Sequence, residues 1–231
     1  MDWTIKNPLP VEGRTIGFVG KGGGAKSTIL AHLLRYWHAM GIPAVGHDAD
    51  DSAKHQAGTL LAWAEELSAH GPGFGSPVYR APAASSLAAE VKRLRPAHGL
   101  SVIDTKAWES RTLNIHYATV KTADLLVMAL YPSGVEKDRG GLIWAAMDEV
   151  EAMSGRRPRI SCLLTRFNSS ASAADDVRKE LEDEDVHVLK TTIAASEAKD
   201  GYAQSFGKVP ALKKDSPMHQ LALELLTEVM K

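Results

Sequence analysis

The most constraining feature of the sequence is the glycine-rich stretch FVGKGGGAKSTIL, residues 18–30. It separates a short apolar segment, TIGFVG at 15–20, from residues 26–40, where apolar side chains recur at helical spacing. A glycine-rich turn between a strand and a helix lets backbone N–H groups approach an anion, and the helix N-terminus adds a positive partial charge. The stretch therefore predicts a phosphate-binding loop in an α/β fold.

Two different phosphate-binding loops can be read in these letters. Gly20-x-Gly22-x-x-Ala25 fits the dinucleotide fingerprint, whereas Gly20 followed by Ala25-Lys26-Ser27 nearly fits the triphosphate loop. A magnesium triphosphate needs a lysine for its terminal phosphates and a hydroxyl for the metal, and the start of the predicted helix supplies both. A dinucleotide loop needs neither, so the sequence favours a nucleoside triphosphate over a nicotinamide dinucleotide.

Acidic residues follow two of the predicted strands. Asp48 and Asp50 lie at the end of the second strand, and Asp104 ends the segment LSVID at 100–104. Asp48 could bind a ribose hydroxyl in a dinucleotide site, but a second carboxylate is surplus to that role. Asp104 stands where a triphosphate site places an acid that faces the magnesium shell. Both Asp48 and Asp104 could instead be caps at strand ends.

Strand-like and helix-like segments alternate along the chain. Strands are predicted at 15–20, 42–48, 78–81, 100–104, 125–131, 159–167 and 186–193, and helices at 26–40, 60–67, 87–94, 143–153, after 167, at 196–206 and at 217–230. Apolar strands without alternation indicate a parallel sheet that is buried on both faces. We expect a single α/β domain over residues 1–231, a P-loop fold whose mostly parallel, twisted sheet is flanked by helices.

Composition limits the classes of protein that fit. The formal net charge is −1, so nucleic-acid binding would need a local basic patch. The single cysteine, Cys162, agrees with a reducing compartment and with a place in the core. Without a signal peptide or an apolar run long enough to span a membrane, the sequence predicts a cytoplasmic protein.

The segment KGGGAKST at 21–28 resembles the deviant Walker A motif, K-G-G-x-G-K-[ST]-T, of the ParA/MinD ATPases. The additional lysine, Lys21, distinguishes that motif from ordinary phosphate-binding loops. The resemblance continues through the D-x-D motif at 48–50, the Walker B-like Asp104-Thr105, and the segments ADLLVMALYPS at 123–133 and LLTRFN at 163–168. It covers most of the chain and implies ATP and Mg²⁺ as ligands.

The resemblance also implies a role for each matching residue of the loop. Lys26 would neutralise the β- and γ-phosphates, and Lys21 would reach across a dimer to the nucleotide of the other subunit. Ser27 would ligate magnesium and Thr28 would contact the α-phosphate. The residues implied to surround the phosphates are Gly22, Gly23, Gly24, Ala25, Lys26, Ser27 and Thr28.

Residues outside the loop complete the implied site. Asp50 would orient or activate the attacking water, and Asp48 would lie beside the metal shell. Asp104 would hold magnesium through water, and Asn168 would contact the adenine.

In function, the chain looks like a small ParA of the plasmid-partition type. Such a protein forms a homodimer on ATP, binds DNA nonspecifically on the nucleoid, and hydrolyses ATP when a ParB-like centromere-binding adaptor stimulates it. The candidate DNA contacts are Arg156, Arg157, Arg159, Lys199, Lys208, Lys213 and Lys214. The C-terminal segment lacks the basic face that anionic lipid requires, so we expect a packed helix and no membrane contact.

Four departures from the motifs leave an alternative open. Ala25 stands where the family has glycine, at a cost on the order of 1 kcal/mol if the backbone there has positive φ. The other departures are Asp51-Ser52 after the D-x-D motif, Lys106-Ala107 in place of two prolines, and Ser196-Glu197 where arginine is common. They make slow hydrolysis a hypothesis, as in a nucleotide-gated positioning or regulatory protein whose cargo is not DNA. A nicotinamide oxidoreductase is the third hypothesis.

Overall fold

The computed structural model describes residues 2–50, 58–71, 73–108, 114–131, 141–167, 173–194 and 205–231. The strands are β1 (Arg14–Val19), β2 (Ala44–Ala49), β3 (Val78–Arg80), β4 (Leu100–Thr105), β5 (Leu125–Leu130), β6 (Arg159–Phe167) and β7 (Ile193–Ala194). The helices are α1 (Lys26–Ala39), α2 (Thr59–His70), α3 (Leu87–Leu94), α4 (Asn114–Thr122), α6 (Gly141–Ser154), α7 (Ala173–Asp183) and α8 (Pro217–Glu228), with a 3₁₀ turn, η1, at Ala84–Ser86.

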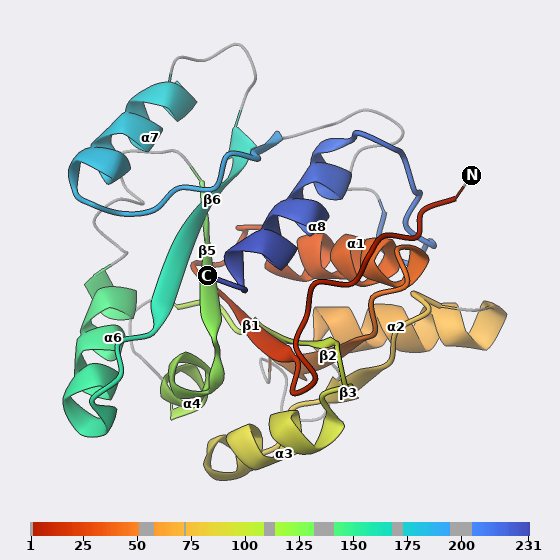
Figure 1. The fold of residues 1–231 in the computed structure, drawn as a ribbon, viewed down its shortest axis with the longest axis horizontal. Coiled ribbons are helices and arrows are strands. Elements are labelled where there is room, and N and C mark those ends of the chain that lie inside the picture. The colour runs from red at the N-terminus through yellow and green to blue at the C-terminus, as the bar shows by residue number, and fades with distance from the viewer. Residues whose placement is uncertain are drawn as a thin grey trace.

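The described strands form one sheet in the order β3-β2-β4-β1-β5-β6-β7, and every pairing is parallel (Figure 1). The chain reaches each next strand through a helical crossover, as the alternating sequence pattern predicted. The expected α/β fold with a parallel sheet is therefore confirmed. Because β1 lies in the middle of the sheet, the glycine-rich turn that follows it opens at the centre of one sheet edge.

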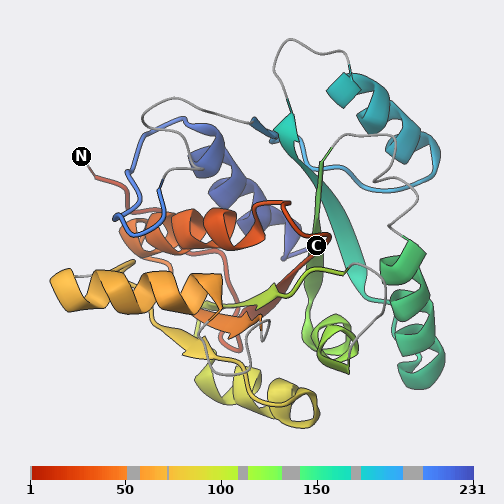
Figure 2. The ribbon, with the colours of Figure 1, turned by 180° about the vertical axis from the view of Figure 1, so that it is seen from behind.

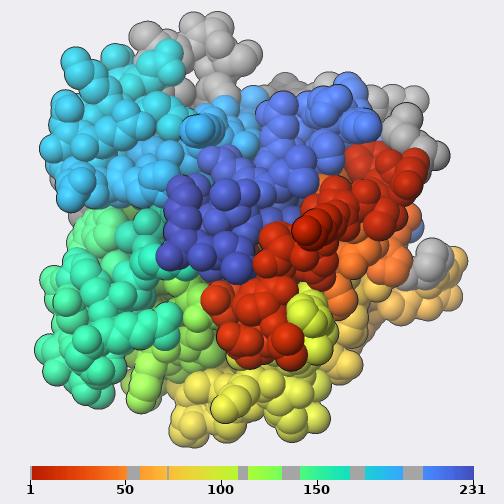
Figure 3. Space-filling view, in the orientation of Figure 1, coloured from red at the N-terminus to blue at the C-terminus, as the bar shows by residue number. Residues whose placement is uncertain are grey.

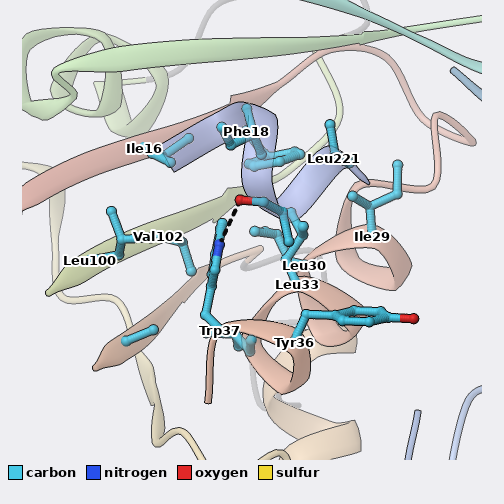
Figure 4. Packing of buried hydrophobic residues seen from close by; sticks show 14 of the residues in the cluster. Ile16, Phe18, Ile29, Leu30, Leu33, Tyr36, Trp37, Leu100, Val102 and Leu221 are labelled. Carbon is cyan, nitrogen blue, oxygen red and sulfur yellow. Dashed lines mark hydrogen bonds between the residues drawn. The ribbon is translucent and has the colours of Figure 1, made fainter. Parts of the chain in front are cut away.

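Helices α1, α2 and α8 cover one face of the sheet (Figures 1 and 2). Their apolar sides pack on strand residues such as Phe18 and Val102, and α8 packs along α1. The indole of Trp37 in α1 is fully buried and donates a hydrogen bond to the Ala222 carbonyl of α8 at 3.1 Å (Figure 4). The C-terminal helix is thus a packed element, as predicted.

The N-terminal segment adds a further layer beside α1 and α8. The Trp3 ring packs edge-on against His219 of α8, with centroids 5.3 Å apart, and against Tyr36 of α1. In the space-filling view this segment lies against α8 on the surface of the molecule (Figure 3). It adds apolar cover at the end of α1 that is remote from the glycine-rich turn.

Helices α3, α4 and α6 cover the opposite face of the sheet (Figure 2). The cluster beneath α4 and α6 contains Leu126, Met128, Met147 and Cys162, so the single cysteine is a buried core residue, as expected. Helix α4 was not among the predicted helices. Its sequence, NIHYATVKT, is rich in β-branched and aromatic residues, so packing between α3 and α6 outweighs weak helix propensity there.

The predicted strand at 186–193 is wrong over most of its length. Only an isolated bridge, Val188 with Cys162, and the two-residue β7 pair with β6. The intervening backbone N–H groups of Lys190 and Thr191 donate instead to the Glu224 carboxylate of α8, at 2.7 and 2.9 Å. A side chain from a distant helix thus takes the place of a neighbouring strand as the hydrogen-bond acceptor. The local sequence pattern does not predict such a contact. The helix predicted at 196–206 lies mostly outside the described residues.

Candidate nucleotide site

The turn between β1 and α1, residues 20–25, is called the phosphate loop below. Its backbone takes positive φ at Gly20 (129°), at Gly23 (82°) and at Ala25 (61°). A Cβ atom at Gly20 would lie 2.7 Å from the Ala129 carbonyl oxygen, closer than real Cβ contacts. The loop is therefore held against the end of β5, and the glycine is needed both for its backbone angle and for this approach.

Ala25 is the N-cap residue of α1 and has left-handed backbone angles, φ 61° and ψ 21°. The sequence predicted that alanine at this position destabilises the loop if φ is positive. The structure has that positive φ, so the alanine is strained. No side chain caps this helix, and its first turn holds no acidic residue. The N–H groups at the start of α1 consequently keep their positive partial charge for an anion.

Lys26 is 7% exposed, and its ammonium group folds back over the phosphate loop. The Nζ atom donates to the carbonyl oxygens of Gly20 at 3.1 Å and of Lys21 at 3.0 Å. A buried lysine that donates to two loop carbonyls is placed to exchange these acceptors for phosphate oxygens.

Asp104 lies at the carboxyl end of β4, beside β1. It is fully buried, and neither carboxylate oxygen has a hydrogen-bond partner among the described residues. Burial raises its pKa to about 7, the Ser27 hydroxyl and the Lys26 ammonium oppose that rise, and the Asp48 and Asp50 carboxylates reinforce it. The hydroxyl of Ser27 is near the carboxylate but outside hydrogen-bond geometry.

An uncompensated carboxylate in the core is costly unless a cation joins it. Oxygen ligands from a carboxylate and a hydroxyl are those that Mg²⁺ prefers. The residues at this point, Asp104 with Ser27 close by, therefore have the chemistry to hold a magnesium ion at the phosphate loop.

Asp48 aligns with Asp104 across β2 and β4, but its side chain has a structural task. Its oxygens accept the backbone N–H of Asp50 at 3.0 Å and of Leu61, in the first turn of α2, at 2.7 Å. Burial raises its pKa, and these two hydrogen bonds oppose the rise. A Cβ at Gly58, the N-cap residue of α2, would overlap the Asp48 carboxylate. Asp48 is thus a cap for α2 and lies next to the metal candidate.

Two residues that sequence reasoning missed touch the phosphate loop. The Arg166 guanidinium, at the end of β6, donates to the Gly23 carbonyl at 2.7 Å. The Trp108 backbone N–H donates to the Gly20 carbonyl at 3.2 Å, and its buried ring stacks on His116 with centroids 4.3 Å apart. Arg166 stood within the quoted segment LLTRFN, but sequence position alone gave no reason to single it out.

The proposed adenine contact, Asn168, lies outside the described residues, as do Asp51-Ser52, Ser196-Glu197 and Lys199. The remaining departure is described: the Lys106 carbonyl faces the His116 ring nitrogen Nε2 at 3.3 Å. In place of two prolines, a polar contact and the Trp108 ring shape the segment after β4.

The candidate DNA contacts divide into two groups. The three arginines contact protein groups: Arg156 lies 3.5 Å from Asp124, Arg157 bridges to two acids of α6, and Arg159 donates to the last carbonyls of α8. They lie at the amino end of β6, away from the phosphate loop. The exposed lysines Lys208, Lys213 and Lys214 lie between β7 and α8.

Comparison with known proteins places the fold. No protein-family model and no curated protein matches the sequence. Solved structures do match, among them the MinD cell division protein of Aquifex aeolicus, at 14% identity and a TM-score of 0.66, covering 94% of this chain and 97% of that one. A ParA family ATPase from Chlorobium tepidum matches at 14% identity and a TM-score of 0.62, covering 96% and 99%.

The chain has the fold of the MinD/ParA ATPases. A third neighbour is cobyrinic acid a,c-diamide synthase from Mycobacterium smegmatis, solved with an ATP analogue and magnesium, at 14% identity and a TM-score of 0.66 over 94% of this chain and 96% of that one. A cell division protein and a synthase thus share this fold, so the fold alone does not fix a function. In the described part of the chain, no helix combines the length and apolarity needed to cross a membrane.

Proposed function

We propose that this chain is a switch ATPase: Mg²⁺ and ATP join two copies of it, and hydrolysis parts them. The observation that carries the proposal is Asp104, a buried carboxylate without a partner in the described structure, next to Ser27 and Lys26 at the phosphate loop. A neighbour of the same fold was solved with an ATP analogue and magnesium, which agrees with that chemistry.

The residues of the loop have separate tasks in this scheme. The N–H groups of the phosphate loop and of the start of α1 bind the phosphates, and Lys26 exchanges its loop carbonyls for β- and γ-phosphate oxygens. Ser27 and Asp104 would hold the magnesium ion, which when bound neutralises phosphate charge. Thr28 contacts the α-phosphate, and Lys21 supplies a positive charge to the nucleotide of the partner copy.

Asp50 is the residue that we assign to the attacking water. It follows β2, is half-buried, and lies close enough to Asp104 to influence its pKa. Asp48 fixes the direction of the chain at this point, because its carboxylate binds the N–H of Asp50 and the first turn of α2. Movement of Asp50 would thus be linked to α2 through one carboxylate.

The strand order disfavours the dinucleotide alternative. In the dinucleotide fold the strand with the ribose-binding acid lies directly beside the first strand. Here β4 separates β2 from β1, and Asp48 is 3% exposed with both oxygens engaged. A ribose hydroxyl would find little of this carboxylate open.

For the cargo we propose DNA, bound nonspecifically by the exposed lysines between β7 and α8, in a plasmid-partition system with a ParB-like adaptor. Three arginine candidates already contact protein groups, so the lysines carry this part of the proposal. Phosphate contacts predict that binding falls steeply with salt. The alternative, a positioning or regulatory protein with slow hydrolysis, is favoured by the structural task of Asp48 and by the segment after β4. It predicts nucleotide-dependent dimerisation without adaptor-stimulated turnover.

Light scattering coupled to size exclusion tests the switch. We expect wild type to be a dimer with Mg²⁺ and ATP and a monomer with ADP or without nucleotide. Lys21→Ala should remain monomeric with ATP, whereas Lys92→Ala, an exposed lysine of α3, should behave as wild type. A monomer under all conditions, or a Lys21→Ala protein that dimerises normally, contradicts the proposal.

A further inference from the structure

Arg166 has an uncommon backbone conformation for a residue within a strand. Its φ is 54°, and the pairing between β6 and β7 shifts register between Thr165 and Phe167, so a bulge is centred on Arg166. The other described non-glycine residues with positive φ lie in turns or at the N-cap of α1. Bulges and left-handed residues of this kind are enriched beside functional sites, where they redirect a side chain.

The bulge directs the guanidinium of Arg166 onto the phosphate loop. Its Nη1 atom donates to the Gly23 carbonyl at 2.7 Å, joining residues 143 positions apart in the sequence. The end of β6 is itself anchored, because the Thr165 hydroxyl donates to the Leu130 carbonyl of β5 at 3.3 Å. A fixed strand end thus presents a charged donor to a glycine whose own backbone has φ 82°.

This contact determines how one peptide unit of the loop is turned. In a planar trans peptide the C=O and the following N–H point in opposite directions. When Arg166 holds the Gly23 carbonyl, the Gly24 N–H is therefore turned away from Arg166. Gly24 also lies close to the end of β5, since a Cβ there would lie 3.2 Å from the Ala129 carbonyl oxygen.

Lys26 cannot keep the loop in this shape once a ligand is bound. Its ammonium group holds the carbonyls of Gly20 and Lys21, and it must share or release them to bind phosphate. The bond from Arg166 involves a different carbonyl and needs no such exchange. Its charge also lies beside the loop, where it attracts a polyphosphate.

We propose that Arg166 is a positioning residue for polyphosphate binding: it holds the Gly23 carbonyl so that the Gly24 N–H is presented to the β-phosphate of a nucleoside di- or triphosphate. This inference rests on the proposed nucleotide-binding function and adds a residue to that site. It predicts selectivity for ligands with two or more phosphates, because a monophosphate does not need the Gly24 N–H.

The test separates backbone strain from the guanidinium. Arg166→Gly removes the donor and relieves the strain of positive φ, which offsets the greater flexibility of the unfolded chain, so its melting temperature should stay within a few degrees of wild type. We expect its affinity for fluorescent mant-ADP to fall about five- to tenfold, with weak AMP binding unchanged. Arg166→Lys, which keeps charge and a donor, should recover part of the affinity. Arg178→Ala removes an arginine donor to the Leu189 carbonyl, far from the loop, and should bind as wild type.

Each outcome decides something different. Wild-type affinity for mant-ADP in Arg166→Gly, or an equal loss in Arg178→Ala, overturns the role of Arg166 and leaves the proposed function intact. An equal loss for AMP and ADP overturns the link to the β-phosphate. Failure of the wild type to bind either nucleotide overturns the proposed function, and the role of Arg166 with it.

Discussion

Replacing Ala25 by glycine should stabilise this protein, although glycine normally destabilises the interior of a helix. Ala25 has φ 61° and ψ 21°, a left-handed conformation that costs an L-residue about 1–2 kcal/mol. Glycine removes that cost but makes the unfolded chain more flexible, which offsets about 0.4–1 kcal/mol. Loss of the half-buried methyl group of Ala25 reduces the gain by a few tenths of a kcal/mol more, at roughly 25 cal/mol per Å² of buried apolar surface. The net gain in the free energy of unfolding is about 0.5 kcal/mol, or about 1–2 °C in melting temperature for a chain of this size.

Urea denaturation of the nucleotide-free protein measures this gain against a matched control. Ala145 is an exposed residue within α6, and Ala145→Gly should destabilise by about 1 kcal/mol because the backbone there is helical. The same substitution should thus have opposite signs at the two positions. A loss of stability in Ala25→Gly as large as that in Ala145→Gly would show that Ala25 is not left-handed in solution.

Three further predictions concern buried polar groups. In Gly58→Ala the added methyl group would overlap the carboxylate that caps α2, so the free energy of unfolding in urea should fall by about 2 kcal/mol. Gly141→Ala is the control: no atom lies within 4 Å of the added Cβ, and the free energy of unfolding should change by less than about 0.5 kcal/mol. Asp104→Asn should raise the stability of the nucleotide-free protein at pH 8 by about 1 kcal/mol, because it removes a buried charge, and should weaken Mg²⁺–ATP binding at least tenfold; lower stability with intact binding contradicts this. Burial lowers the pKa of His32 and of His47 to about 4, so below pH 6.5 the unfolded state takes up protons that the folded state does not. Each histidine should therefore lower stability by about 2 kcal/mol between pH 7.5 and pH 5, while protonation of the buried Asp104 acts in the opposite direction. The difference in stability between wild type and His47→Gln isolates one histidine and should change by about 2 kcal/mol over that range, and a pH-independent difference would refute its neutral burial.

The parts of the fold that follow from sequence are those with a local cause. The glycine-rich turn, the apolar parallel strands and the helical spacing after Lys26 each reflect the chemistry of neighbouring residues, and the structure has them within a few positions of their predicted bounds. The failures have distant causes. The Glu224 carboxylate takes the N–H groups that the strand at 186–193 would have used, and packing between α3 and α6 forms α4 from a sequence with weak helix propensity.

The candidate site shows the same division. Motif spacing predicted that Asp104 and the loop lysine meet, since the carboxyl ends of adjacent parallel strands share an edge. Motif spacing did not predict that Asp48 caps α2. The Leu61 N–H that it accepts is 13 positions away in the sequence, and no motif links the two residues. Arg166 was missed for a related reason. A bulge turns its side chain toward the loop, and the residue types around it do not predict that bulge.

Equilibrium binding of ATP, with and without Mg²⁺, tests the central claim most directly: that the turn after β1 holds a magnesium-bound polyphosphate. We expect the wild type to bind ATP more tightly with Mg²⁺ than without it, to show no binding of NADH, and to lose ATP affinity at least a hundredfold in Lys26→Ala, since a buried charge-assisted contact is removed. Binding of NADH in preference to ATP, or equal ATP affinity in wild type and Lys26→Ala, would contradict the account.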